Sequence, residues 1–258
     1  MTTRVAASNL RYTVGSAILL NDVSITVDAG ELVGVIGPNG AGKSTLLHVL
    51  AGDLIPAAGT VEIGGANAPG VDEPRLARLR AVLPQHRTAT VPFTAYEVVA
   101  MGRYPYRRDP TNTAAADEKA IGNAMARTAT VQFADRVFAT LSGGEQARVS
   151  LGRVFAQETP VLLLDEPTAA LDVAHEERVM QELTTRAASG SAVVAVLHDL
   201  NTAARYATRI VAMAQGEVRA QGSAQAVLTS ELLTEIYDQP MRVVPHPFRD
   251  CPLILVAD

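Results

Sequence analysis

Four short runs of apolar residues recur along the chain, each bounded by glycine, proline or polar residues. They cover Leu32–Ile36, Val161–Leu164, Ala192–Leu197 and Ile210–Ala214. Uninterrupted apolar runs of this length are typical of strands that are buried on both faces, as in a parallel sheet covered by helices. The pattern therefore predicts an α/β fold built on a mostly parallel sheet.

The amino-terminal part of the chain has a different pattern, in which apolar and polar residues alternate. Val5–Tyr12, Val23–Val27 and Thr60–Ile63 show it, and Ser24 and Thr26 mark the polar face of the second stretch. Alternation is typical of strands with one solvated face. We expect these segments to form an antiparallel subdomain at an edge of the structure.

Between Pro84 and Thr159 the buried-strand pattern gives way to helical patterns. Thr94 and Glu97 form a capping-box sequence ahead of apolar residues, and Asp117–Thr128 has the periodicity of a helix. Proline and threonine residues supply the loops between these stretches. The pattern predicts a helical insertion between two groups of strands.

The length of 258 residues suits one large domain or two small ones. The chain contains no internal repeat, low-complexity tract or heptad run, which excludes coiled-coil and solenoid architectures. We expect a single domain over 1–258, in which 1–84 and 160–258 form the core and 85–159 form the helical subdomain.

Charge and cysteine content exclude several classes of protein. There are 22 Lys and Arg residues against 27 Asp and Glu, a net charge of -5, so no basic field would hold a nucleic acid. A single Cys251 excludes an internal disulfide and a thiolate zinc cage. The first residues lack a signal-peptide pattern, and no apolar stretch is long enough to span a bilayer. We expect a soluble chain, and peripheral attachment to a membrane protein stays open.

A glycine-rich loop follows the first buried strand and precedes an apolar helix. It satisfies G-x-x-x-x-G-K-[ST] with the residues Gly37, Pro38, Asn39, Gly40, Ala41, Gly42, Lys43, Ser44 and Thr45. The glycines allow backbone N–H groups and a helix N-terminus to face one anion. Lys43 is expected to reach the β- and γ-phosphates, and the Ser44 hydroxyl to ligate Mg²⁺. The motif predicts a nucleoside-triphosphate site, the alternative being a glycine-rich turn without a ligand.

Two acidic residues follow the second buried strand. In open α/β sheets, ligands lie at the carboxyl ends of the strands, which is where Val161–Leu164 leads into Asp165 and Glu166. We expect Asp165 to hold Mg²⁺, directly or through water, and Glu166 to take a proton from the attacking water.

A second anion site is indicated by Leu141–Gln146, which precedes a helix running to Phe155. Ser142 and Glu145 have capping-box spacing, and a helix start with two glycines also exposes several N–H donors. The capping role and the anion-binding role are compatible.

This ordered set of motifs resembles the ATP-binding cassette family, the motor subunits of ABC transporters, over essentially the whole chain. The matching segments are the Walker A loop Gly37–Thr45, the Q-loop Gln85, the signature Leu141–Gln146, the Walker B strand Val161–Glu166, the D-loop Ala170–Asp172 and the switch histidine His198. The resemblance implies ATP hydrolysis.

The resemblance also implies roles for single residues. Lys43, Gln85, Glu166 and His198 would be catalytic, with His198 at the γ-phosphate, and the Mg²⁺ ligands would be Ser44, Gln85 and Asp165. Tyr12 matches the aromatic that stacks on adenine, the alternative being an ordinary strand aromatic. The other histidines show no metal-ligand spacing.

The chain departs from the family's usual pattern at two places. Glu145 stands where the signature most often has Gln, and the D-loop lacks a common serine at Ala169 and Ala170. Neither change removes a phosphate ligand, but both bear on the coupling between subunits.

In cassettes of this family, the signature of one subunit completes the phosphate site of another. The single cassette therefore implies a homodimer in which Ser142, Gly143 and Gly144 act across the interface. The family also implies separate transmembrane permease subunits docking near 85–108, at the cytoplasmic face of the cell membrane, and an indirect partnership with a periplasmic or surface binding protein. The docking contact would be extended by Tyr104, Tyr106, Arg107 and Arg108, unless these residues form a solvated basic turn.

The segment 91–103 resembles importer ATPases for iron chelates and cobalamin. The stretch 197–206 and the tail at 244–254 resemble the ATPases of bacterial haem importers most, with ferric siderophore and cobalamin ATPases as alternatives. His246 and Cys251 are residue types that ligate haem iron, but their proline-flanked setting is typical of a rigid surface strand or docking element.

Non-transport cassette proteins are the remaining alternatives. Those of DNA repair carry a long coiled coil within the cassette, and those of translation carry two cassettes, and neither feature occurs here. A regulator without catalysis would lack Lys43 or Glu166, and both are present.

Overall fold

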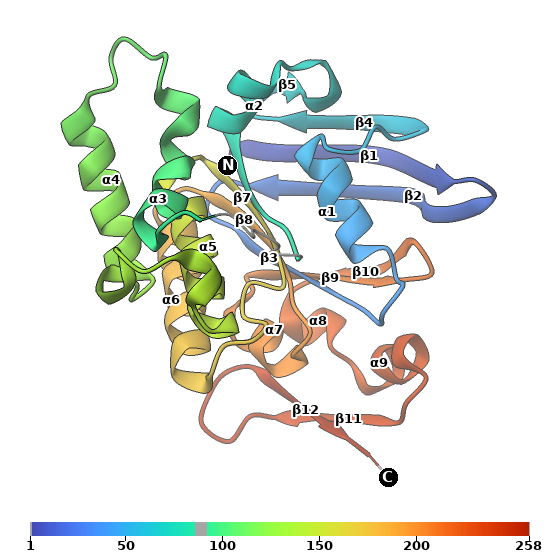
Figure 1. Ribbon diagram of the computed structural model, residues 1–258. Helices are drawn as coiled ribbons and strands as arrows, with labels where there is room; N and C mark the ends of the chain where they lie inside the picture. The colour runs from blue at the N-terminus through green and yellow to red at the C-terminus, as the bar shows by residue number, and fades with distance from the viewer. Residues whose placement is uncertain (1, 86–91, 258) are drawn as a thin grey trace.

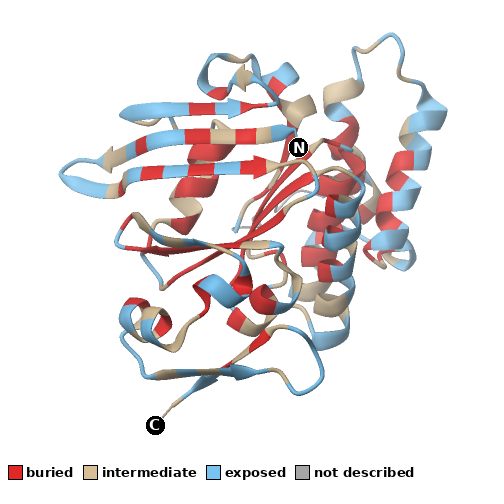
Figure 2. Ribbon diagram, turned by 180° about the vertical axis from the view of Figure 1, so that it is seen from behind, coloured by how far each residue is buried: buried red, intermediate tan, exposed pale blue. Residues whose placement is uncertain are grey.

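The computed structural model describes residues 2–85 and 92–257 and is built around a six-stranded sheet (Figure 1). In spatial order its strands are β10 (Glu217–Gly222), β9 (Arg209–Ala214), β3 (Leu32–Ile36), β8 (Ala192–Val196), β7 (Val161–Asp165) and β6 (Arg80–Leu83). All neighbours from β9 to β6 are parallel, and β10 is antiparallel to β9. The four apolar runs are the central strands β3, β7, β8 and β9, and they are buried as predicted (Figure 2).

The alternating segments form the expected antiparallel sheet. Its strands are β2 (Ala17–Asp28), β1 (Thr3–Val14), β4 (Ala58–Ile63) and β5 (Ala66–Asn67), in that spatial order. Helix α1 (Lys43–Ala51) contacts strands of both sheets, and its apolar residues join those of β1, β2 and β4 in one hydrophobic cluster. The start of α1 is therefore held firmly between the two sheets.

The described residues between β6 and β7 form helices joined by loops and turns, with one isolated β-bridge. The helices are α3 (Ala95–Ala100), η2 (Met101–Tyr106), α4 (Ala114–Arg127), η3 (Val131–Phe133), η4 (Phe138–Thr140) and α5 (Gly143–Ala156). The capping box of Thr94 and Glu97 is confirmed at the start of α3, and α4 begins three residues before the expected Asp117. Residues 86–91 of the expected docking segment, including Val91, lie outside the described residues.

Helix α5 packs closely against η2 and α3. A Cβ added to Gly102 would lie 2.3 Å from the Arg153 carbonyl oxygen, and one added to Gly152 would lie 3.1 Å from Val99 Cγ2. The buried Arg103 guanidinium donates to the Ala156 carbonyl at 2.9 Å. The contact is thus made by backbone and a buried ion-pairing side chain, which leaves little room for the helices to slide.

The carboxyl-terminal part contains five further short elements. These are α7 (Leu200–Tyr206), α8 (Ala224–Val227), α9 (Ser230–Tyr237) and the strands β11 (Met241–Pro245) and β12 (Pro252–Val256), which pair as a hairpin. The sequence patterns did not predict the three helices. Figure 1 shows the hairpin at the base of the molecule, below α7 and α8. Two further helices are α2 (Glu73–Leu79) and α6 (Val173–Ala188). Among residues 2–85 and 92–257, no helix has the length and apolar character needed to cross a bilayer.

Candidate functional site

The loop between β3 and α1 curls through three glycines with positive φ. These are Gly37 at 146°, Gly40 at 80° and Gly42 at 95°. A Cβ on Gly37 would lie 2.1 Å from the Met213 carbonyl oxygen, and one on Gly42 would lie 2.6 Å from the Leu19 carbonyl oxygen. Both positions therefore require glycine for reasons of space as well as backbone conformation.

The turn between β9 and β10 supports this loop from below. The N–H of Gly216 donates to the Ala41 carbonyl at 3.1 Å, and the Gly216 carbonyl accepts from the Asn21 N–H at 2.9 Å. Sequence reasoning missed this support. The dipeptide Gln215-Gly216 indicates a turn, but nothing in it indicates that the turn lies under a loop 170 or so residues earlier.

Helix α1 leaves its N-terminus open to an anion. Its N-cap residue is Gly42, no side chain caps the first turn, and no acidic residue lies there. Lys43 Nζ donates to the carbonyl oxygens of Gly37 and Pro38 at 2.7 and 2.8 Å. Burial lowers the pKa of Lys43, against the opposing effect of Glu166 and Asp165. An anion in the loop would meet free N–H groups, the helix dipole and this ammonium.

Asp165 is the last residue of β7 and is only 1% exposed. Neither of its carboxylate oxygens has a hydrogen-bond partner among the described residues. Burial raises the pKa of Asp165, and the neighbouring Ser44 hydroxyl opposes the shift. An unpaired buried carboxylate is costly unless a cation compensates it. Carboxylate and hydroxyl oxygens are also the ligand type that Mg²⁺ prefers, so Asp165 and Ser44 fit that ion.

Glu166 stands at the centre of a cluster drawn from three parallel strands. Its Oε1 accepts from Gln85 Nε2 at 2.7 Å and lies 2.5 Å from His198 Nε2. These residues follow the carboxyl ends of β6, β7 and β8, and the Glu166 side chain is 15% exposed against 49% for His198. A carboxylate so placed can accept a proton from a water that attacks a bound phosphate.

The cluster and the phosphate loop share one cavity of about 260 Å³. It is lined by Leu19, Asn39, Gly40, Ala41, Gly42, Lys43, Ser44, Thr45, Gln85, Glu166 and His198. Motifs that are far apart in the sequence therefore meet at one edge of the sheet. Tyr12 is not among these residues. It lies on β1 opposite Leu20 and packs half-buried on the adjacent hydrophobic cluster, so its contact with adenine stays a prediction.

The predicted second anion site begins α5. Glu145 accepts from the Ser142 N–H at 2.7 Å, the Ser142 hydroxyl accepts from the Glu145 N–H at 3.4 Å, and this confirms the capping box. The bond from the Ser142 N–H lowers the pKa of Glu145, and Arg136 lies 3.6 Å away. The carboxylate that stands where Gln is usual is therefore bonded to its own helix end.

The structure does not bring the signature and the phosphate loop into one cavity. Gly143 and Gln146 line an adjoining hollow of about 250 Å³, which shares Gln85 and Glu166 with the nucleotide cavity and contains no residue of the phosphate loop. Ser142 and Gly143 are exposed, and a Cβ on Gly143 would meet no atom within 4 Å. These two residues are thus accessible to a ligand outside the subunit.

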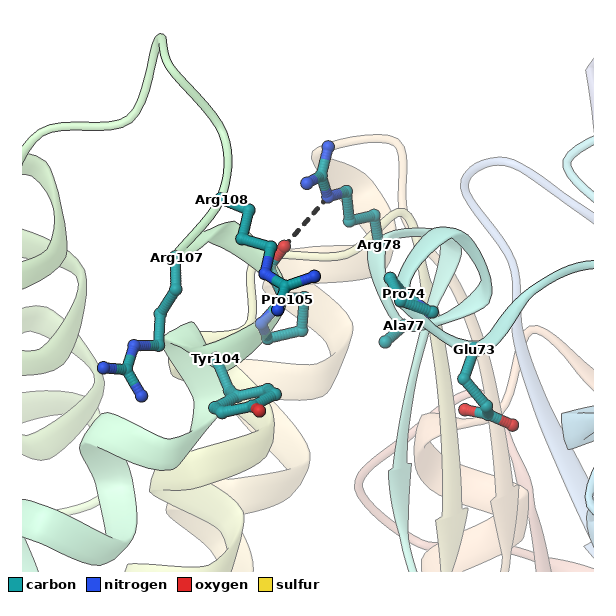
Figure 3. A pocket seen from close by; sticks show the side chains of 8 residues that line it. All are labelled: Glu73, Pro74, Ala77, Arg78, Tyr104, Pro105, Arg107 and Arg108. Atoms are coloured by element: carbon teal, nitrogen blue, oxygen red, sulfur yellow. Dashed lines mark hydrogen bonds between the residues drawn. The ribbon is translucent and has the colours of Figure 1, made fainter.

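A larger cleft of about 710 Å³ lies between α2 and η2 (Figure 3). Glu73, Pro74, Ala77 and Arg78 form one wall, and Tyr104, Pro105, Arg107 and Arg108 form the other. Figure 3 shows Arg78 reaching across to the Pro105 carbonyl, to which its Nε donates at 3.0 Å.

Tyr106, which we expected to extend this docking contact, does not line the cleft. Its hydroxyl donates to the Gln157 carbonyl at 2.8 Å, and its ring lies 4.1 Å from the buried Arg103 guanidinium. Tyr106 is therefore half-buried and engaged within the chain, and its part in docking stays a prediction.

Comparisons with known proteins agree with this geometry. The ABC transporter family model matches residues 20–169. The hemin import ATP-binding protein HmuV of Nocardia farcinica is 53% identical over 92% of this chain and 82% of its own. The cobalamin import ATP-binding protein BtuD of Halobacterium salinarum is 44% identical over 89% of this chain and 57% of its own. A dimeric ATP-binding cassette in a post-hydrolysis state with bound ADP and Pi is 30% identical, with a TM-score of 0.76 over 85% of this chain and 98% of its own. The predicted α/β cassette fold is confirmed.

Proposed function

The chain belongs to the ABC transporter family, and on that premise we propose that it is the ATP-hydrolysing subunit of an importer for haem. The observation that carries the ATPase activity is the single cavity in which Lys43, Glu166 and His198 meet. The identity to a hemin import protein over nearly the whole chain supports haem as the cargo. A ferric siderophore or cobalamin importer is the alternative, since a cobalamin import protein is also similar.

We propose that Lys43 and the N–H groups of the phosphate loop neutralise the β- and γ-phosphates. Glu166 would take the proton of the attacking water, and His198 would contact the γ-phosphate. The positions of these three side chains around one cavity support the assignment. Gln85 and His198 both contact Oε1 of Glu166, so Oε2 would be the oxygen that receives the proton of the water.

Mg²⁺ would be held by Asp165 and Ser44, with Gln85 as a third ligand. The orphaned oxygens of Asp165 support this proposal. The ion supplies charge neutralisation at the phosphates, while the protein orients the water and holds the proton acceptor.

The family acts as dimers, and a dimeric cassette is among the similar structures. We propose that Ser142, Gly143 and Gly144 of one protomer close over the nucleotide of its partner. Ser142 and Gly143 are exposed, and no residue of the phosphate loop lines the hollow that Gly143 lines, which supports an intermolecular role. ATP would favour the closed dimer because its γ-phosphate contacts both subunits, and hydrolysis would remove that preference.

We propose that the cleft between α2 and η2 is where the permease docks, at the cytoplasmic face of the membrane. The cleft lies within the expected docking region 85–108 on one side. Arg107 and Arg108 are exposed, and no acidic side chain of the described residues pairs with them. A permease segment carrying a carboxylate would neutralise this wall. We also propose that 85–159 forms the helical subdomain, with 1–84 and 160–258 as the ATP-binding core.

Reconstitution with the cognate permease in liposomes tests the cargo directly. Haem, a ferric siderophore and cobalamin would be supplied separately with their binding proteins, and ATP-dependent accumulation compared. Accumulation of haem supports the proposal, and uptake of another cargo without haem refutes the cargo alone. The matched Lys43→Ala complex serves as the control without hydrolysis.

A further inference from the structure

Asn201, three residues after the switch histidine His198, is hydrogen-bonded to the carboxyl-terminal hairpin. Asn201 Oδ1 accepts from the Ile254 N–H at 2.8 Å, and its Nδ2 donates to the Ile254 carbonyl at 3.2 Å. One carboxamide thus satisfies both backbone groups of a residue in β12. Ile254 is only 7% exposed and belongs to the same hydrophobic cluster as Leu200 and Ala203 of α7, so this attachment is well anchored.

Asn201 lies in the first turn of α7, which begins directly after His198 and Asp199. The Asp199 carboxylate caps the helix by accepting from the N–H groups of Asn201 and Thr202 at 3.0 and 3.2 Å. The Thr202 hydroxyl lies 3.0 Å from the Glu176 carboxylate of α6. The helix start that carries His198 is thus fixed to α6 on one side and to β12 on the other.

His198 depends on this backbone for its position. Its imidazole is half exposed, and the contact that the structure gives it is with Glu166. A single contact with one carboxylate oxygen does not by itself fix the orientation of an exposed ring. The ring is placed by the backbone at the start of α7, because an exposed side chain gains little orientation from packing.

We propose that Asn201 is a positioning residue for His198, acting by fastening the start of α7 to the hairpin β11–β12. The inference rests on the proposed role of His198 at the γ-phosphate. It also gives the tail a function: β12 stabilises one end of the catalytic cluster, although no tail residue lines the nucleotide cavity.

A matched contact provides the control. The other strand of the hairpin is tied to α9 by the Val243 N–H, which donates to Ser230 Oγ at 2.9 Å. Ser230→Ala removes a side-chain bond to the same hairpin without touching α7. If Asn201 merely anchors the tail, the two variants should behave alike.

The test compares ATP hydrolysis by the unmodified chain and its Asn201→Leu variant, which keeps the side-chain volume and loses both bonds. We expect kcat to fall about tenfold or more, since small misplacements of catalytic groups have effects up to about 10²-fold. The KM for ATP should stay within about twofold because the phosphate loop is unchanged. Ser230→Ala should retain the parent kcat. If Asn201→Leu fails to fold, Asn201→Asp removes the amide donor alone and takes its place.

A double-mutant cycle with His198→Ala separates the role of Asn201 from the proposed role of His198. If Asn201 acts through His198, Asn201→Leu should lower kcat no further in the His198→Ala background. An equal loss in both backgrounds, an unchanged kcat, or an equal loss in Ser230→Ala would overturn the inference while leaving the proposed role of His198 intact. If His198→Ala itself keeps the parent kcat, the proposed role of His198 fails and the inference fails with it.

Discussion

Replacing Glu166 by Gln separates the chemistry of the site from its architecture. Gln keeps the shape of the side chain and one oxygen that can accept from Gln85 Nε2, which lies 2.7 Å from Glu166 Oε1 in the parent. It loses the negative charge that faces His198 and the capacity to take a proton. An ion pair to a side chain that is 49% exposed contributes about 0–1 kcal/mol to stability. Loss of a general base lowers the rate by about 10²–10⁴, which corresponds to about 2.7–5.4 kcal/mol. The kinetic effect is therefore much the larger.

Steady-state phosphate release by purified Glu166→Gln should fall accordingly, while its melting temperature stays close to that of the parent. With MgATP the variant should elute as a dimer in size-exclusion chromatography, because bound ATP is no longer cleaved. Glu182→Gln is a matched control, since Glu182 is similarly buried at 12% exposure and ion-pairs with Arg127 and Arg186 outside the site. A parent rate in Glu166→Gln would refute the base assignment, and a monomer with MgATP would contradict the closed dimer.

Three further substitutions test the phosphate site. Lys43→Ala should weaken MgATP binding in calorimetry and abolish turnover, because the cation that faces the phosphates is lost. An unchanged ATPase rate would contradict the assignment of this loop as the phosphate site. Asp165→Asn should abolish Mg²⁺-dependent hydrolysis yet raise the melting temperature of the nucleotide-free protein. The raised pKa of Asp165 means that its ionised form destabilises the fold at neutral pH. A lower melting temperature would show that the carboxylate has a partner. Gly37→Ala should lower both stability and ATP affinity, since its Cβ would lie 2.1 Å from the Met213 carbonyl oxygen, whereas Gly40→Ala, with no atom within 4 Å of its Cβ, should lose less of either.

The parts of the fold that sequence patterns predict are those with a strong local signal. β3 coincides with its apolar run, and the cap of Thr94 on α3 follows from residue types three positions apart. β6 was not predicted because it is four residues long and starts with Arg80, and a charged residue is not typical of a buried strand. Its guanidinium is compensated by the Ala51 carbonyl at 2.7 Å, a contact between segments far apart in the sequence.

The candidate site, like the fold, is predictable from the sequence only in part. The phosphate loop, Asp165 and Glu166 follow from motifs whose chemistry is local, and the parallel sheet explains why His198 joins them. The support of Ala41 by Gly216 and the fastening of Asn201 to Ile254 depend on tertiary contacts. A lone Asn in a helix and a glycine in a turn have no periodicity that would indicate a partner, so only the structure locates them.

The close packing of Gly102 against Arg153 gives α5 a mechanical part to play. The helix has 14 residues, so it is about 21 Å long. One end is bound to η2 through backbone contacts and the Arg103 guanidinium, and the other carries the exposed Ser142 and Gly143. If α5 contacted η2 through long flexible side chains, these side chains would change rotamer and absorb a displacement of η2. A contact of backbone against backbone instead transmits a displacement along the helix. If the permease docks at the cleft and the dimer closes as we propose, a displacement at η2 would therefore reach the nucleotide of the neighbouring subunit through α5.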